Sequence, residues 1–132
     1  MPRNFVLDSL KQRGQFIATF FLYNKDMNNT EILAIFKRLK SIAGYFSKKT
    51  PKGITFRDAD NYDYEIYGLF QEWQKTFPSR DFKKEFPCSD ALWEELASWD
   101  AQESWTHERA ERIIKSAENA LKEIDDYLRL HE

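Results

Sequence analysis

The amino-acid sequence predicts an all-α fold, a compact bundle of about five helices in a single domain, residues 1–132. The first supporting observation is a C-terminal stretch, residues 106–130, whose apolar residues recur every three or four positions without Pro or Gly. The second is that the same spacing recurs in earlier stretches, which polar segments or Pro and Gly separate. The third is that strand-like stretches are few and short, so a sheet has little from which to form.

The C-terminal helix, residues 106–130, is the element against which we expect the others to pack. Thr106 can cap its start, and Glu108 stands where the helix dipole favours an anion. Its predicted buried stripe consists of Ile113, Ala117, Leu121, Ile124 and Leu128. On the polar side, acid-before-base pairs four residues apart contribute about 0.3 kcal/mol each. These pairs are Glu108–Arg112, Glu111–Lys115, Glu118–Lys122 and Asp125–Arg129.

Residues 4–23 have two interpretations. Apolar residues at helical spacing predict one helix that continues past Gly14, where glycine costs about 1 kcal/mol relative to alanine. Residues 15–23 are rich in side chains that favour β-structure, so the alternative is a strand there. We expect the helix, because the remaining chain offers few strands for pairing.

The next helix begins in a polar turn. Asn28 and Glu31 have the spacing of a capping box and predict a helix that ends near Ser47. Residues 48–53 contain Pro and Gly, which predict an exposed loop. The alternating residues 54–57 predict at most a short strand or hairpin.

Helical spacing resumes at Asp60 and continues to Phe77, where Pro78 follows. Residues 79–86 predict one or two helical turns. Ser89 is a suitable cap for a helix that ends near Asp100. The inward residues of that helix should be Leu92, Trp93, Leu96 and Trp99.

The sequence lacks the common catalytic motifs, including the zinc-binding histidine pair, the phosphate loop and the nucleophile elbow. His107 and His131 stand at opposite ends of the last helix, about 36 Å apart at 1.5 Å per residue. Cys88 is the single cysteine, which excludes an intrachain disulfide and a multi-cysteine metal site. The dipole of the following helix could activate its thiol, but we expect a half-buried structural residue. We therefore expect a protein that is not an enzyme and needs no cofactor.

Targeting and membrane signals are also missing. The N-terminus lacks the pattern of a signal peptide. No run of about 18 uncharged apolar residues occurs, so we expect no membrane span. These observations predict a cytoplasmic protein.

The charge is divided unevenly along the chain. Residues 1–57 carry 11 Lys or Arg and 3 acids, a net charge of +8, whereas residues 58–132 carry 9 Lys or Arg and 19 acids, a net charge of −10. This division suits a basic face for a polyanion, an acidic face for a basic partner, or two parts that dock on each other within the chain. It also suits a homodimer in which opposite parts of two copies meet.

The acidic stretch at residues 58–65 does not match a calcium loop, because Tyr62, Asp63 and Leu69 occupy the fifth, sixth and twelfth positions. We therefore expect no metal site. Tyrosines alternate with these acids, and the same mixture recurs at residues 99–105. Charge speeds association and rigid aromatic rings anchor partners, although some of these rings could instead be core.

Our leading hypothesis is a non-catalytic inhibitor of the immunity, antitoxin or phage-inhibitor type. It would occlude a basic protein, such as a nuclease or toxin, through this acidic-aromatic surface. The residues proposed for contact are Asp58, Asp60, Tyr62, Asp63, Tyr64, Glu65, Tyr67, Trp99, Asp100, Glu103 and Trp105.

The alternative hypothesis is a nucleic-acid-binding accessory protein that uses the basic part of the chain. No base-reading motif accompanies these residues, so binding would follow the phosphate backbone or its shape. A solvated basic face without a partner would have the same composition. The residues proposed for contact are Lys37, Arg38, Lys40, Tyr45, Lys48, Lys49 and Lys52.

Overall fold

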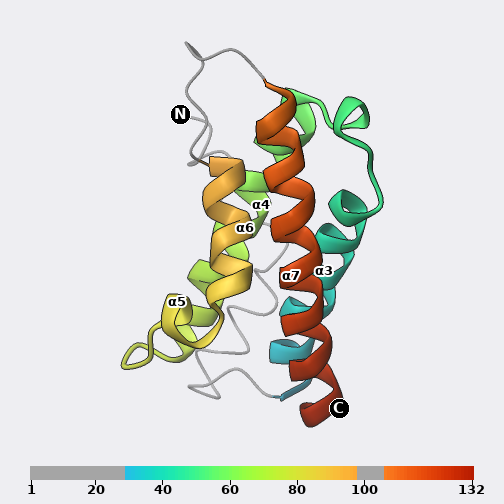
Figure 1. Ribbon diagram of the computed structural model, residues 1–132. Helices are drawn as coiled ribbons and strands as arrows, with labels where there is room; N and C mark the ends of the chain where they lie inside the picture. Colours follow the sequence, from blue (N-terminus) through green and yellow to red (C-terminus); the bar gives the residue numbers. More distant parts are fainter. Residues whose placement is uncertain (1–28, 98–105) are drawn as a thin grey trace.

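The computed structural model describes residues 29–97 and 106–132, and these two stretches form a helical bundle (Figure 1). Within them there are helices and no strands, which confirms the predicted all-α class. The predicted helix or strand in residues 4–23 lies outside the described residues, as do Trp99, Asp100, Glu103 and Trp105. The elements are α3 (Asn29–Ser47), the 3-10 turn η1 (Pro51–Gly53), α4 (Phe56–Thr76), α5 (Phe82–Glu85), α6 (Pro87–Ala97) and α7 (His107–His131).

Helix α7 is the central element, as predicted. It has 25 residues, packs along α3 and α6, and runs antiparallel to α3 (Figure 1). The Thr106 hydroxyl accepts a hydrogen bond from the Arg109 N–H at 3.2 Å, which confirms the predicted cap. Leu121 was predicted to be buried in the stripe, but it is half-buried at the edge of the stripe. The apolar residues buried along the stripe are Ala110, Ile113, Ala117, Ala120, Ile124 and Leu128.

The charged side chains of α7 make other pairs than the four that their spacing predicts. Arg112 reaches Glu95 of α6, with its Nε 3.1 Å from the carboxylate. Asp125 reaches Lys40 of α3 at 2.9 Å. Within α7, Glu111 pairs with His107 at 2.6 Å instead of with a lysine. For Arg112 and Asp125, an opposite charge on a neighbouring helix lies within reach, and these two tertiary pairs replace contacts that would stabilise an isolated helix only weakly.

The predicted short strand or hairpin at residues 54–57 is wrong. Helix α4 begins at Phe56, four residues before the expected start at Asp60. Thr55 has an extended backbone, and its hydroxyl accepts the Asp58 N–H at 3.1 Å. Residues that favour β-structure therefore form a helix N-terminus here, because the threonine cap and the buried Ile54 side chain outweigh local preference.

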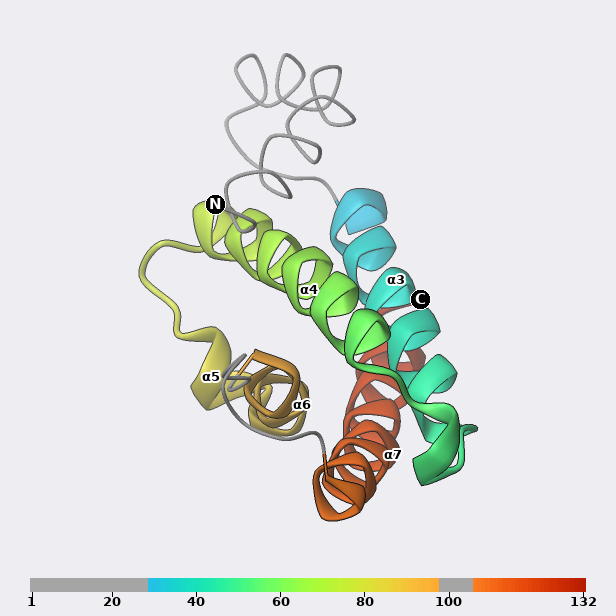
Figure 2. The same cartoon turned by 90° about the horizontal axis from the view of Figure 1, so that it is seen from above.

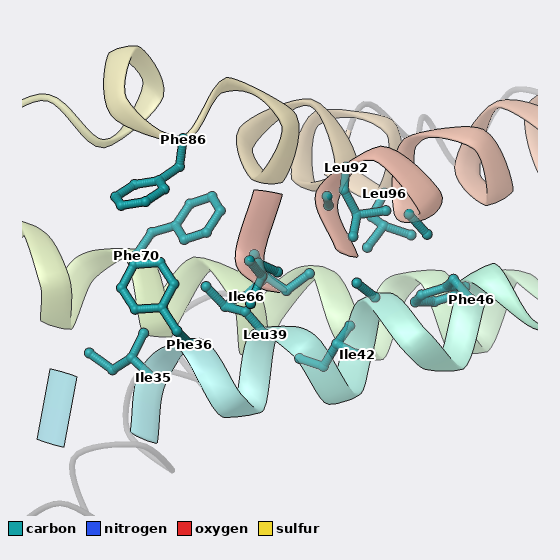
Figure 3. Packing of buried hydrophobic residues seen from close by; sticks show 14 of the residues in the cluster. Ile35, Phe36, Leu39, Ile42, Phe46, Ile66, Phe70, Phe86, Leu92 and Leu96 are labelled. Carbon is teal, nitrogen blue, oxygen red and sulfur yellow. The ribbon is translucent and has the colours of Figure 1, made fainter. Parts of the chain in front are cut away.

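The core contains a cluster of aromatic rings (Figure 3). The ring centroids of Phe70 and Phe82 are 4.1 Å apart, and those of Phe36 and Phe86 are 4.9 Å apart. Trp73 is 1% exposed and meets Phe82 edge-on at 5.2 Å. These rings account for part of the aromatic excess as core packing, which leaves fewer of them for a binding surface.

Helix α6 begins at Pro87, three residues before the expected start at Asp90, so Ser89 is not its cap. The cap comes instead from α7. The Glu123 carboxylate accepts the backbone N–H groups of Cys88 and Ser89 at 3.0 and 2.7 Å, and also the Ser89 hydroxyl at 2.7 Å. The short helix α5 confirms the one or two turns predicted for residues 79–86.

None of the helices in the described ranges combines the length and the apolar character that crossing a membrane requires.

Replacing Glu123 with alanine should lower the free energy of unfolding by about 1–3 kcal/mol, because two backbone N–H groups and one hydroxyl lose their acceptor. Urea denaturation followed by circular dichroism measures this change. Glu118→Ala, an exposed acid on the same helix, is the matched control and should change stability by less than about 0.5 kcal/mol. Equal effects of the two substitutions would contradict the role of Glu123 as a cap.

Candidate functional site

Most of the described acids proposed for the acidic-aromatic surface make bonds within the chain. Asp58 accepts the Tyr45 hydroxyl at 2.9 Å. Asp63 is 5% exposed and accepts the Trp93 indole N–H at 2.8 Å. Glu65 forms an ion pair with an arginine of α3, described below. Only Asp60, which is half-buried, has no such contact among the described residues.

The tyrosines of this stretch also face neighbouring rings. Tyr62 packs against the core, with ring centroids 5.3 Å from Phe46 and 5.1 Å from Tyr45. Tyr67 lies 6.0 Å from the ring of Trp93. Tyr64 is half-buried. Binding of a basic partner through this surface stays a prediction, with less exposed charge and ring area than the sequence suggested.

The spacing of α4 contained a signal for the burial of Asp63. Its buried positions are Ala59, Asp63, Ile66, Phe70 and Trp73, which recur every three or four residues. Asp63 therefore belongs to the apolar stripe, where a carboxylate must find a donor. The donor, Trp93, could not be identified from spacing, because it lies on another helix.

The basic side chains of α3 meet acids from the later part of the chain. Arg38 forms a bidentate ion pair with Glu65 of α4, one of whose contacts is 2.7 Å. The Lys40 ammonium lies 2.9 Å from the carboxylate of Asp125 in α7. The Lys37 ammonium lies 3.4 Å from the carboxylate of Glu132, which follows α7. The hydrogen bond to Asp125 raises the pKa of Lys40 above its ordinary value. Some of the basic residues in the first part of the chain therefore pair with acids in the second part of the same chain.

A groove on the outer face of α3 is lined by four lysines, of which Lys37 and Lys40 make the ion pairs described above and Lys48 and Lys49 do not. Its volume is about 740 Å³. The positions on α3 recur at helical spacing, so they share one face. At Gly44 an added Cβ atom would meet nothing within 4 Å, which leaves this face open. The lining residues are Lys37, Lys40, Ser41, Gly44, Tyr45, Lys48, Lys49 and Leu121.

Tyr45 forms part of the groove wall in a fixed orientation. Its hydroxyl donates to Asp58, and its ring lies 5.2 Å from Phe46, edge-on, and beside Tyr62. The hydrogen bond to the Asp58 carboxylate, aided by burial, raises the pKa of Tyr45, so the hydroxyl keeps its proton. The Lys49 ammonium lies over the ring, 4.5 Å from its centroid.

Lys52 and Arg57 add to the charge of the groove residue Lys48 near the C-terminal end of α3. Lys48, Lys52 and Arg57 are exposed, and in residues 29–97 and 106–132 no acid lies within ion-pair distance of them. The negative end of the α3 dipole favours a cation at Lys48. Together with the other groove lysines, these three cations give this end of the bundle a positive surface. The sequence indicated these lysines, but not Ser41, Gly44 or Leu121 as their neighbours.

Nowhere in the described part of the chain do three His, Cys, Asp or Glu side chains come together as a metal-binding group. Cys88 is half-buried in the first turn of α6, next to Glu123. Burial, together with the negative charge of Glu123, raises the pKa of the Cys88 thiol, which opposes any activation by the helix dipole.

The chain matches no family model, no curated protein and no solved structure at a significant level. Any function proposed for it depends on its own side chains.

The Cys88 thiol should react with iodoacetamide only at high pH. In the native protein the pH midpoint of the reaction should lie above that of the same cysteine in urea, because the folded state disfavours the thiolate. Glu123→Gln should lower the native midpoint, since it removes the nearby negative charge. The pH midpoint depends on the acidity of the thiol and not on how accessible the thiol is to the reagent. A native midpoint at or below the unfolded one would contradict this picture.

Proposed function

We propose that this protein is a non-catalytic nucleic-acid-binding protein and that the lysine-lined groove on α3 is its binding site. The observation that carries the proposal is the convergence of Lys37, Lys40, Lys48 and Lys49 on one groove. Lysine ammonium groups are point donors that bind phosphate without reading bases. Binding is therefore independent of sequence and depends strongly on salt.

The internal ion pairs of the groove are compatible with phosphate binding. The side chains of Lys37 and Lys40 are 61% and 51% exposed despite their acidic partners. Exposed ion pairs of this kind contribute little, about 0–1 kcal/mol, and they weaken further with salt. Each ammonium also has three donors, so a phosphate oxygen can join or replace the carboxylate. Lys48 and Lys49 supply charge that no described acid pairs with.

The number of lysines sets the expected salt dependence. Four neutralised phosphates give a slope of log affinity against log salt of about −3.6 for a duplex and about −2.8 for a single strand. A slope near zero would mean that the lysines do not contact phosphates. Fluorescence anisotropy with a labelled oligonucleotide, titrated at several salt concentrations, measures this slope.

Replacing Lys48 and Lys49 together with glutamine should weaken single-strand binding about tenfold at 0.05 M salt and reduce the slope by about 1.4. The matched control is Lys83→Gln with Lys84→Gln, which removes the same charge from α5, on the far side of the bundle from α3 (Figure 2). The control should bind almost as well as the natural chain. Equal weakening by both double variants would mean that net charge, and not the groove, governs binding.

The two acids that pair with the groove lysines should weaken the binding of nucleic acid, because they repel its phosphates. Asp125→Asn combined with Glu132→Gln frees Lys40 and Lys37 and removes two negative charges beside the groove. We expect binding about threefold tighter at low salt, where repulsion from these acids is least screened. Glu108→Gln with Glu111→Gln, at the other end of α7, should change the affinity less. Unchanged or weaker binding in the first variant would contradict the assignment of the site.

The inhibitor hypothesis makes a different prediction for affinity capture. Tagged protein at about 0.1 M salt, where the Debye length is about 10 Å, should recover nucleic acid that nuclease removes. A single basic protein that survives nuclease and is lost in the Asp60→Asn variant would favour the inhibitor and overturn the proposal. Asp60 is the suitable residue, because Asp63 and Glu65 make internal bonds whose loss would disturb the fold.

A further inference from the structure

One aromatic ring, that of Tyr45, lines the groove in addition to its lysines. We propose that it binds a single strand and that Tyr45 carries one unpaired base by stacking. This inference rests on the proposed function and names the form of nucleic acid that the site takes. The observation behind it is that the ring of Tyr45 is held rigidly in the wall of the groove, among the lysines that would hold the phosphates.

Three contacts fix the ring before any ligand arrives. The hydroxyl donates to Asp58 at 2.9 Å, Phe46 meets the ring edge-on, and Tyr62 lies beside it. A ring that is already ordered loses little conformational entropy on binding. Such a ring resembles the stacking platforms on which single-strand-binding proteins hold successive bases.

Lys49 shows how the ring can exchange one partner for another. In the free protein its ammonium lies 4.5 Å from the ring centroid, over the π-face. A nucleotide carries both a flat base and a phosphate, so the base can take the place of the ammonium over the ring. The flexible lysine stem then carries the ammonium to the adjacent phosphate. One nucleotide can therefore contact both the Tyr45 ring and the Lys49 ammonium, whereas a phosphate without a base can contact only the ammonium.

The length of the groove is suited to a short strand. From Lys37 to Lys48 the helix rises about 16 Å, at 1.5 Å per residue. At the spacing of a stacked strand, 3.4 Å, this length corresponds to about five nucleotides. In a duplex the base faces are covered by their neighbours, so Tyr45 could not reach one without unstacking it. The groove should therefore prefer a single strand to a duplex of equal length.

The experiment compares three labelled probes by fluorescence anisotropy at 0.05 M salt: the octanucleotide dT8, an octamer of the same backbone without bases, and an eight-base-pair duplex. The natural chain should bind dT8 about tenfold more tightly than the abasic octamer, since stacking on one aromatic ring is worth about 5- to 150-fold. Tyr45→Leu should remove this difference and leave the salt slope unchanged, because no charge is lost. Tyr45→Phe, which keeps the ring, should retain most of it.

Tyr67→Leu is the matched control, because Tyr67 lies against Trp93 and does not line the groove. It should leave the preference for dT8 intact, and thermal melting of all variants shows whether they fold. Equal binding of dT8 and the abasic octamer, with a steep salt slope, would overturn the stacking role of Tyr45 and leave the proposed function standing. Tighter binding of the duplex would also overturn this inference. Failure of all three probes to bind at low salt would overturn the proposed function itself.

Discussion

The packing of α3 and α6 against α7 depends on a seam of small side chains. Of the residues Ala110, Ile113, Ala117 and Ala120, three are alanines, and all four have no exposed area. Small side chains let helix backbones approach closely and leave little free volume between them. Burial of this seam supplies non-directional stability, and polar contacts then fix the positions of the helices. Glu123 sets where α6 begins, and Asp125 adds an exposed ion pair with Lys40 across the contact between α7 and α3.

The proposed site is a consequence of the same arrangement. Helix α3 turns its apolar stripe toward α7, so its lysines are left on the outer face, where Gly44 keeps the surface open. Glu65, Asp125 and Glu132 reach the arginine and the lysines in the middle of α3, but no described acid reaches Lys48 just after its end. The net charge of a segment is therefore a poor guide to its surface, because opposite charges within a few ångströms matter more than distant ones.

The sequence predicted the elements that apolar periodicity defines. The buried stripe of α7 lies where its spacing placed it, apart from Leu121, and the Thr106 cap was identified from one residue type. Periodicity could not identify contacts between helices. The cap that Glu123 gives to α6 joins residues 34 positions apart, and the Asp63–Trp93 bond joins residues 30 positions apart. The start of α4 was missed because the local β-preference of residues 54–57 concealed a threonine cap. The sequence indicated the lysines of the groove and allowed for pairing of the basic and acidic parts within the chain, but it could not identify the individual partners.

The place of α7 in the chain also has a consequence for synthesis on the ribosome. Its main partner, α3, is made about 80 residues earlier, so the apolar stripe of α3 has no seam to cover it while the middle of the chain is being translated. At about 5–20 residues per second this interval lasts several seconds. The nascent chain thus exposes Phe36 and its neighbours to chaperones or to other chains, until translation delivers the last helix and the core can close.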